Sequence, residues 1–193
     1  MANRRRPPRA SSSVLVFGYG SLVALDAASG ATLARLPGFR RTFGVAMDNR
    51  RAIPGYKVYA DPDGGDPRPA VYVAFLDLEE DAGSSVNGTL RAVSPTELEA
   101  LDARERNYDR IEVSDPIDGE ARGRVFAYRG SAAGRTRLAR GRAEGTAVVA
   151  RDYLEGVRRA FAALGPEQER AFLASTELDA LPVRELERVE LPA

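Results

Sequence analysis

The apolar residues in the first two thirds of the chain fall in short runs, rich in β-branched and aromatic side chains, that are bounded by glycine, proline and other turn residues. Runs of this length and composition are typical of β-strands. The pattern predicts strands over 14–17, 32–36, 40–47, 70–78, 86–93, 108–113 and 124–128. The second and third are expected to be separated by Pro37-Gly38, and the fourth and fifth by a turn at Gly83-Ser84-Ser85.

Helical periodicity appears at three places in the chain. Ser94-Pro95-Thr96-Glu97 combines an N-cap serine, a proline at the first helical position and a glutamate three residues after the cap. A helix is therefore expected from here to about Glu105. Two further helices are predicted over 150–164 and 167–174. The pattern does not decide the structure of 135–149 or 180–193.

The segment 48–69 is rich in proline and glycine and is predicted to form a long loop. Long loops in compact domains are often functional. The predicted strands precede most of the helices and do not alternate regularly with them. This order indicates an α+β fold built on a largely antiparallel sheet or barrel.

The composition excludes several kinds of chemistry. The chain has no His and no Cys, so it has no disulfide, thiolate nucleophile, zinc finger or Ser-His-Asp triad. Catalysis would have to use carboxylates, hydroxyls, arginines or backbone groups. No clustered acidic run resembles a calcium loop, so we expect no metal. The 28 basic and 28 acidic side chains balance, which argues against a nucleic-acid-binding surface.

The N-terminal residues 1–13 contain several arginines and prolines and no acid, and we expect them to form a disordered basic tail. A basic stretch followed by apolar residues can resemble a secretory signal. Here Gly18-Tyr19-Gly20-Ser21 interrupts the apolar run, and the charge-free stretch 10–25 is too short to span a bilayer. A buried first strand is the better interpretation. The sequence thus predicts a cytoplasmic protein with no membrane partner.

A glycine-rich turn, Phe17-Gly18-Tyr19-Gly20-Ser21-Leu22, directly follows the first predicted strand. Such a turn allows backbone N–H groups to face a bound anion or a developing oxyanion. A Rossmann motif would need a third glycine at Val23 and a helix opening there, and we expect neither. A P-loop would need a lysine here, but the only lysine is Lys57. A plain tight turn after a core strand is an equally good interpretation.

The predicted helix that ends near Glu105 directs one carboxylate toward its apolar face. At about 100° per residue, Glu105 lies about 10° from the centre of the face defined by Leu98 and Leu101, whereas Asp102 lies about 70° away. A carboxyl group withdrawn from water has a raised pKa, which suits a general base or acid. In the alternative interpretation, Glu105 lies at a fraying helix end and pairs with a neighbouring arginine.

Two tyrosines are further candidates for the same site. Tyr108 follows this helix, and Tyr153 lies early in a later one. Each could equally be a core residue with its hydroxyl in water.

Taken together, three segments resemble the γ-glutamylcyclotransferase-like superfamily, which includes γ-glutamylcyclotransferases, γ-glutamylamine cyclotransferases, ChaC-type enzymes and AIG2-like proteins. They are Gly18 to Leu22, Leu36-Pro37-Gly38-Phe39-Arg40-Arg41, and Gly88-Thr89-Leu90 leading to Leu101 to Tyr108. The resemblance covers roughly 14–164. It leaves 165–193 as a C-terminal helical extension expected to pack on this domain.

The resemblance implies a small, mixed, largely antiparallel β-barrel with flanking helices. It also implies an intramolecular reaction, in which the α-amino group of a γ-glutamyl substrate attacks the γ-amide carbonyl to release an amine and 5-oxoproline. Glu105 corresponds to the family's catalytic glutamate. Tyr19, Gly20, Ser21 and Leu22 correspond to the substrate-binding turn, and Tyr108 and Tyr153 to tyrosines around the pocket. No cofactor is implied.

Some questions stay open at this level. Leu22 directly after Ser21 is closer to the ChaC form, whereas the helix with Glu105 is closer to the γ-glutamylcyclotransferase form. Nothing in the sequence predicts the leaving amine or an oligomeric state. A binding or regulatory protein that keeps the fold without turnover is the main alternative. A nucleic-acid binder would rest only on the arginines of residues 4–9.

Overall fold

The computed structural model describes residues 14–27, 32–119, 123–178 and 180–192. The tail predicted over 1–13 lies outside these residues. The helices are α1 (Leu22–Ala27), α2 (Pro95–Arg104), α3 (Ala132–Ala143), α4 (Arg151–Ala163) and α5 (Pro166–Ala174). The strands are β1 (Val14–Gly18), β2 (Thr32–Asp48), β3 (Lys57–Ala60), β4 (Tyr72–Val93), β5 (Tyr108–Glu112), β6 (Arg124–Gly130), β7 (Ala147–Ala150), β8 (Val183–Arg184) and β9 (Glu187–Glu190).

The main sheet is mixed and largely antiparallel, as the α+β prediction requires. Its strand order is β5-β6-β1-β4-β7-β8, and β2 pairs with β4 outside this path. The long β2–β4 ladder and the β1–β4 and β5–β6 ladders are antiparallel, while β1–β6, β4–β7 and β7–β8 are parallel. In the described part of the chain the two ends of this path, β5 and β8, do not pair, but Arg35 of β2 forms an isolated antiparallel bridge with Asp118, beyond β5. A second sheet contains only β3 and β9.

The two breaks predicted within the sheet are irregularities of continuous strands. At Pro37-Gly38 the register of β2 against β4 shifts, and Gly38 has a φ of 79° that only glycine adopts easily. The partner of Pro37 is Ser85 and that of Phe39 is Glu80, so the residues between them on β4 bulge out. Glycine and proline here bend a long hairpin ladder and do not end it.

Three other predictions need correction. The segment 48–69 is not entirely a loop, because it contains β3. The extension 165–193 is helical only at its start, in α5, because β8 and β9 follow. A helix does open after the glycine-rich turn, since α1 begins at Leu22. Of the undecided segments, 135–149 contributes to α3 and β7, and 180–193 contributes β8 and β9.

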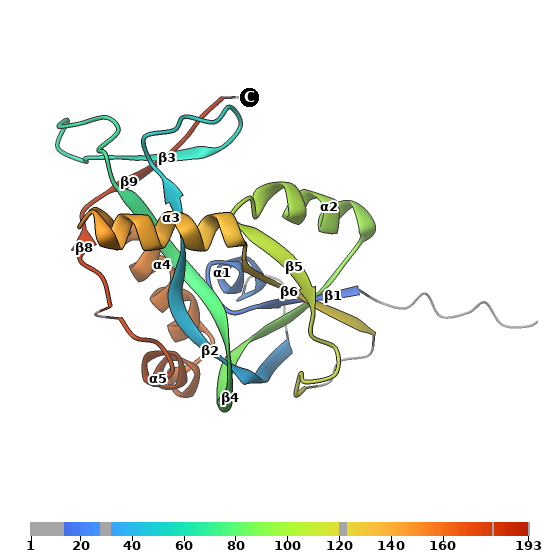
Figure 1. The fold of residues 1–193 in the computed structure, drawn as a ribbon. Helices are drawn as coiled ribbons and strands as arrows, with labels where there is room; N and C mark the ends of the chain where they lie inside the picture. The colour runs from blue at the N-terminus through green and yellow to red at the C-terminus, as the bar shows by residue number, and fades with distance from the viewer. Residues whose placement is uncertain (1–13, 28–31, 120–122, 179, 193) are drawn as a thin grey trace, which may run out of the picture.

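Helices cover both faces of the bent sheet. In Figure 1, α3 crosses in front of β2 and β4, while α1 and α4 lie behind them. The core between these layers is mainly apolar, and the largest of its few buried polar side chains is Arg41 of β2, which is 1% exposed. The Arg41 guanidinium lies 4.9 Å from the ring centres of both Phe161 and Phe172 and donates a hydrogen bond to the Ser175 hydroxyl. This contact fixes α5 to the sheet.

None of the described helices is both long and apolar enough to cross a bilayer.

Candidate active site

A cavity of about 580 Å³ opens between the end of α2, the start of α4, the turn after β1 and the small β3–β9 sheet. A narrower recess of about 20 Å³ lies next to it. Four residues, Ser21, Glu105, Tyr108 and Tyr153, line both spaces, so the recess is the inner end of one site. The volume of the recess admits one group the size of a water molecule or a single oxygen atom.

All seven residues predicted from the sequence meet at this site. Glu105, Tyr108, Tyr153 and Ser21 lie where the cavity and the recess join, and Tyr19, Gly20 and Leu22 line the recess. They come from the turn between β1 and α1, from the first residue of α1, from the end of α2, from the first residue of β5, and from α4.

The turn Tyr19 to Ser21 is held tightly at both sides. The Tyr19 hydroxyl donates to the backbone carbonyl of Tyr128, and the Val23 N–H donates to the Gly20 carbonyl. Within the described residues, the N–H groups of Gly20 and Ser21 donate to no acceptor. Two unused donors therefore belong to residues that line the recess.

Local sequence signals position Glu105. The Ser94 hydroxyl accepts the Glu97 N–H, and the Glu97 carboxylate accepts the Ser94 N–H, so the predicted capping box starts α2. At the other end, the Glu105 N–H donates to the Leu101 carbonyl, and the Tyr108 N–H donates to the Glu105 carbonyl at 2.9 Å. The helix thus ends with Glu105 as its C-cap, directly before β5.

The Glu105 side chain is only 13% exposed. One carboxylate oxygen lies 3.4 Å from Arg104 Nε, and the described residues give it no hydrogen bond. Burial raises the pKa of Glu105, and the nearby cations of Arg104 and Lys57 only partly oppose this. The carboxylate therefore pairs with a neighbouring arginine, as the alternative interpretation held, but it also faces the cavity.

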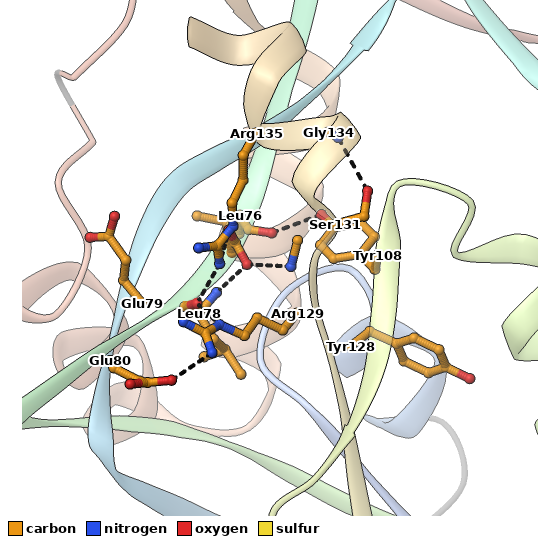
Figure 2. Close-up of polar contacts among 12 residues, drawn as sticks. Leu76, Leu78, Glu79, Glu80, Tyr108, Tyr128, Arg129, Ser131, Gly134 and Arg135 are labelled. Carbon is orange, nitrogen blue, oxygen red and sulfur yellow. Dashed lines mark hydrogen bonds and ion pairs between the residues drawn. The ribbon is translucent and has the colours of Figure 1, made fainter.

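Tyr108 and Tyr153 are both anchored on the peptide backbone of Leu76 in β4. The Tyr108 hydroxyl donates to the Leu76 carbonyl at 2.7 Å, as Figure 2 shows. The Tyr153 hydroxyl accepts the Leu76 N–H at 3.1 Å. Burial raises the pKa of both tyrosines, so both stay protonated at neutral pH. The Tyr108 hydroxyl thus donates its proton to a backbone carbonyl, whereas the Tyr153 hydroxyl donates to no group in the part of the chain that the structure describes.

Behind this anchor, the next residues of β4 are fixed by arginines. Arg129 and Arg135 both donate to the Leu78 carbonyl, on the side of the strand shown in Figure 2. Asp77 is buried and accepts the Gly130 N–H. The strand that positions both tyrosines is thus also hydrogen-bonded at the two residues that follow Leu76.

One wall of the cavity was not predicted from the sequence. Lys57, the first residue of β3, and Tyr56, the residue before it, line this wall. Arg188 lines it from β9. Asn107 supports this wall through its side chain. The amide nitrogen donates a hydrogen bond to the Tyr56 hydroxyl, and the amide oxygen accepts one from Arg137. Two signals were available: the proline- and glycine-rich segment was expected to be functional, and Lys57 is the only lysine. Within the described residues, no acidic cluster could hold a metal ion.

The raised pKa of Glu105 predicts an effect on stability. A carboxyl group with a higher pKa in the folded state stabilises the fold at low pH, and this contribution is lost as the pH rises through the folded pKa. Replacing Glu105 by Gln removes the titration. The melting temperature of the Glu105→Gln variant minus that of the wild type should therefore grow as the pH is raised from about 4 to about 7. Thermal unfolding followed by circular dichroism measures this difference, and a constant difference would contradict the buried environment of Glu105.

Comparison with known proteins found one matching family and several similar solved structures. Residues 16–145 match the family described as gamma-glutamyl cyclotransferase, AIG2-like. A solved structure of a gamma-glutamyl cyclotransferase is similar over 90% of this chain and 94% of its own, with a TM-score of 0.51 and 15% identity. YkqA from Bacillus subtilis is similar over 90% of this chain and 57% of its own, with a TM-score of 0.56 and 16% identity.

These two structural likenesses show a shared fold. A search of curated proteins found no match. The family match itself spans most of the described sheet, the glycine-rich turn, and α2 with Glu105. The chain belongs to the AIG2-like gamma-glutamyl cyclotransferase family.

Proposed function

We propose that this protein is a γ-glutamyl cyclotransferase that converts a γ-glutamyl amine, amino acid or peptide to 5-oxoproline and the free amine, with Glu105 as general base and acid. The observation that carries this proposal is the position of Glu105. Its shielded carboxylate lies where a small recess floored by the turn Tyr19 to Leu22 meets a larger cavity.

The reaction closes a five-membered ring. The α-nitrogen forms a bond to the γ-carbonyl carbon, and the bond from that carbon to the leaving nitrogen breaks. Two protons leave the α-nitrogen and two reach the leaving nitrogen, so a carboxylate that carries a proton between them ends the cycle unchanged. The nucleophile and electrophile belong to one molecule, so the protein's main tasks are to orient the substrate and to transfer the proton.

The electrostatics of Glu105 suit this transfer. An ordinary exposed carboxylate is a weak base, and burial that raises its pKa makes proton uptake from the α-ammonium group easier. The same carboxyl group then gives up its proton to the leaving nitrogen. The Arg104 cation opposes this shift and so favours the ionised form that accepts the proton.

The recess suits the developing oxyanion. It admits a single oxygen atom, and the unused N–H groups of Gly20 and Ser21 belong to residues that line it. Tyr153 is a third donor there, because its hydroxyl accepts from Leu76 and donates to no acceptor among the described residues. These donors support the assignment of Tyr19, Gly20, Ser21 and Leu22 to substrate binding that the family resemblance implies.

The two tyrosines are expected to respond differently to loss of the hydroxyl. Tyr153→Phe removes a free donor beside the reacting carbonyl and should lower kcat by about 10-fold. Tyr108→Phe removes a proton already committed to the Leu76 carbonyl, so it should lower stability by about 1 kcal/mol and change kcat less. Steady-state kinetics and urea unfolding of both variants test this. A larger loss of kcat in Tyr108→Phe would reverse the two roles.

The function is tested by 5-oxoproline release from γ-glutamyl amino acids, γ-glutamyl-lysine isopeptide, simple γ-glutamylamines and glutathione. Release from at least one of these by the purified protein is expected. If none releases 5-oxoproline but some bind, the protein is a binding protein on this fold. If none binds either, the proposal fails.

A further inference from the structure

Lys57 lies in the wall of the cavity that β3 and β9 build. Its ammonium group lies 4.4 Å from the ring centre of Phe75 and 5.5 Å from that of Tyr56. An ammonium group can rest against aromatic faces, but these contacts do not neutralise its charge. Lys57 is also the only lysine of a chain in which every other basic residue is arginine.

The other cations around the cavity are paired. Arg104 lies 3.4 Å from Glu105, Arg159 lies 3.6 Å from Glu155, and Arg188 pairs with Glu190. Among the described residues, no carboxylate lies within ion-pair distance of Lys57.

A largely buried ammonium group without a counter-ion is unfavourable. Burial accordingly lowers the pKa of Lys57 to about 8, so the group is still mostly protonated at neutral pH. An anion bound beside it would relieve this cost, and a carboxylate of a substrate is such an anion.

The position of Lys57 shows which part of a substrate it can reach. Glu105 lines both the recess and the cavity, whereas Lys57 lines only the cavity. A substrate with its γ-carbonyl at the recess and its α-nitrogen at Glu105 extends its leaving part into the cavity. Lys57 therefore faces the leaving part and not the reacting carbonyl.

We propose that Lys57 binds a carboxylate on the leaving part of the substrate, so that the enzyme prefers γ-glutamyl amino acids and peptides to γ-glutamylamines that lack this carboxylate. The inference rests on the proposed function. It makes Lys57 a specificity-determining residue, whereas Glu105 and the glycine-rich turn act on the glutamyl part, which all these substrates share.

The test uses two substrates that differ only in the carboxylate, γ-glutamyl-alanine and γ-glutamyl-ethylamine. The wild type should favour γ-glutamyl-alanine in kcat/KM by about 10- to 100-fold, mainly through KM. Lys57→Met should remove most of this preference and leave kcat/KM for γ-glutamyl-ethylamine within about twofold of the wild-type value. Lys57→Arg should keep part of it, because the charge remains. Arg158→Met, which removes an exposed cation of α4 outside the cavity lining, should leave kcat/KM unchanged for both substrates.

The outcomes separate this inference from the proposed function. If the wild type has equal kcat/KM for both substrates, or if Lys57→Met lowers kcat/KM equally for both, the proposed role of Lys57 is wrong. Either result still agrees with the proposed cyclotransferase activity. The second result would mean that Lys57 binds the α-carboxylate of the glutamyl part. Failure of the wild type to release 5-oxoproline from either substrate counts against the function itself. Calorimetric binding of the same two compounds to Glu105→Gln, with and without Lys57→Met, then still tests the preference for the carboxylate.

A pH profile gives an independent check. Lys57 is faced by Glu105 and Arg104 from the end of α2 and by Arg188 and Glu190 from β9, and its pKa is about 8. Above this pH it loses its charge, so the KM for γ-glutamyl-alanine should rise relative to the KM for γ-glutamyl-ethylamine. A ratio of the two KM values that does not change with pH would contradict the inference.

Discussion

Glu105→Gln is expected to lower kcat for 5-oxoproline release by about 10²- to 10⁴-fold, the range for loss of a positioned general base. Glutamine has the shape of glutamate but cannot take up the proton of the α-ammonium group. The Arg104 side chain and the C-cap geometry do not depend on that proton, so folding should be retained. Steady-state release of 5-oxoproline from the preferred substrate measures the effect.

The matched control is Glu99→Gln, which removes an exposed carboxylate from the same helix. It should leave kcat and KM unchanged. Substrate affinity measured by calorimetry should stay within a few-fold in Glu105→Gln, because the turn and the tyrosines remain. Full activity in Glu105→Gln would rule out Glu105 as the base, and the proton would then have to pass through another group.

Phe172→Ala is expected to lower the free energy of unfolding by about 3–5 kcal/mol. Phe172 is 0% exposed and stacks on Phe161 with ring centres 4.7 Å apart. Its ring also lies 4.9 Å from the guanidinium of Arg41. Removing it leaves a cavity beside a buried cation and weakens the attachment of α5. Urea unfolding followed by circular dichroism at neutral pH measures the loss.

Arg170→Ala is the control, because Arg170 is an exposed residue of α5. Its effect should stay within about 0.5 kcal/mol. If Phe172→Ala were equally mild, α5 would be a separable extension of the domain. The expected large loss would instead mean that residues after 164 are part of the fold.

The signals in the sequence that proved most useful were local. The capping box at Ser94 and Glu97 set the start of α2, and the leucine spacing then directed Glu105 to the cavity. The first strand and the glycine-rich turn were also found from their own residues. In each case, hydrogen bonds within a few residues and the direction of one helical face determine the result.

The parts that could not be predicted depend on pairing between distant residues. Lys57 of β3 is opposite Glu190 of β9, and this ladder decides that a proline- and glycine-rich segment contains a strand. In the tail, which has no periodicity, the same pairing forms β9, and pairing with β7 forms β8. The bulge opposite Gly38 likewise depends on the register of β2 against β4, so the glycine alone could not distinguish a bend from a turn. The wall of the cavity that β3 and β9 build therefore could not be predicted from the sequence.

The strand β9 also affects the behaviour of the protein toward other copies of itself. Without it, β3 would present unpaired N–H and C=O groups, and such an edge promotes β-pairing between molecules and aggregation. β9 covers this edge, but it exposes an edge of its own. All four of its residues are exposed, and three, Glu187, Arg188 and Glu190, are charged. A short charged strand is a poor template for further pairing, so the strand that closes the cavity also protects the sheet from aggregation.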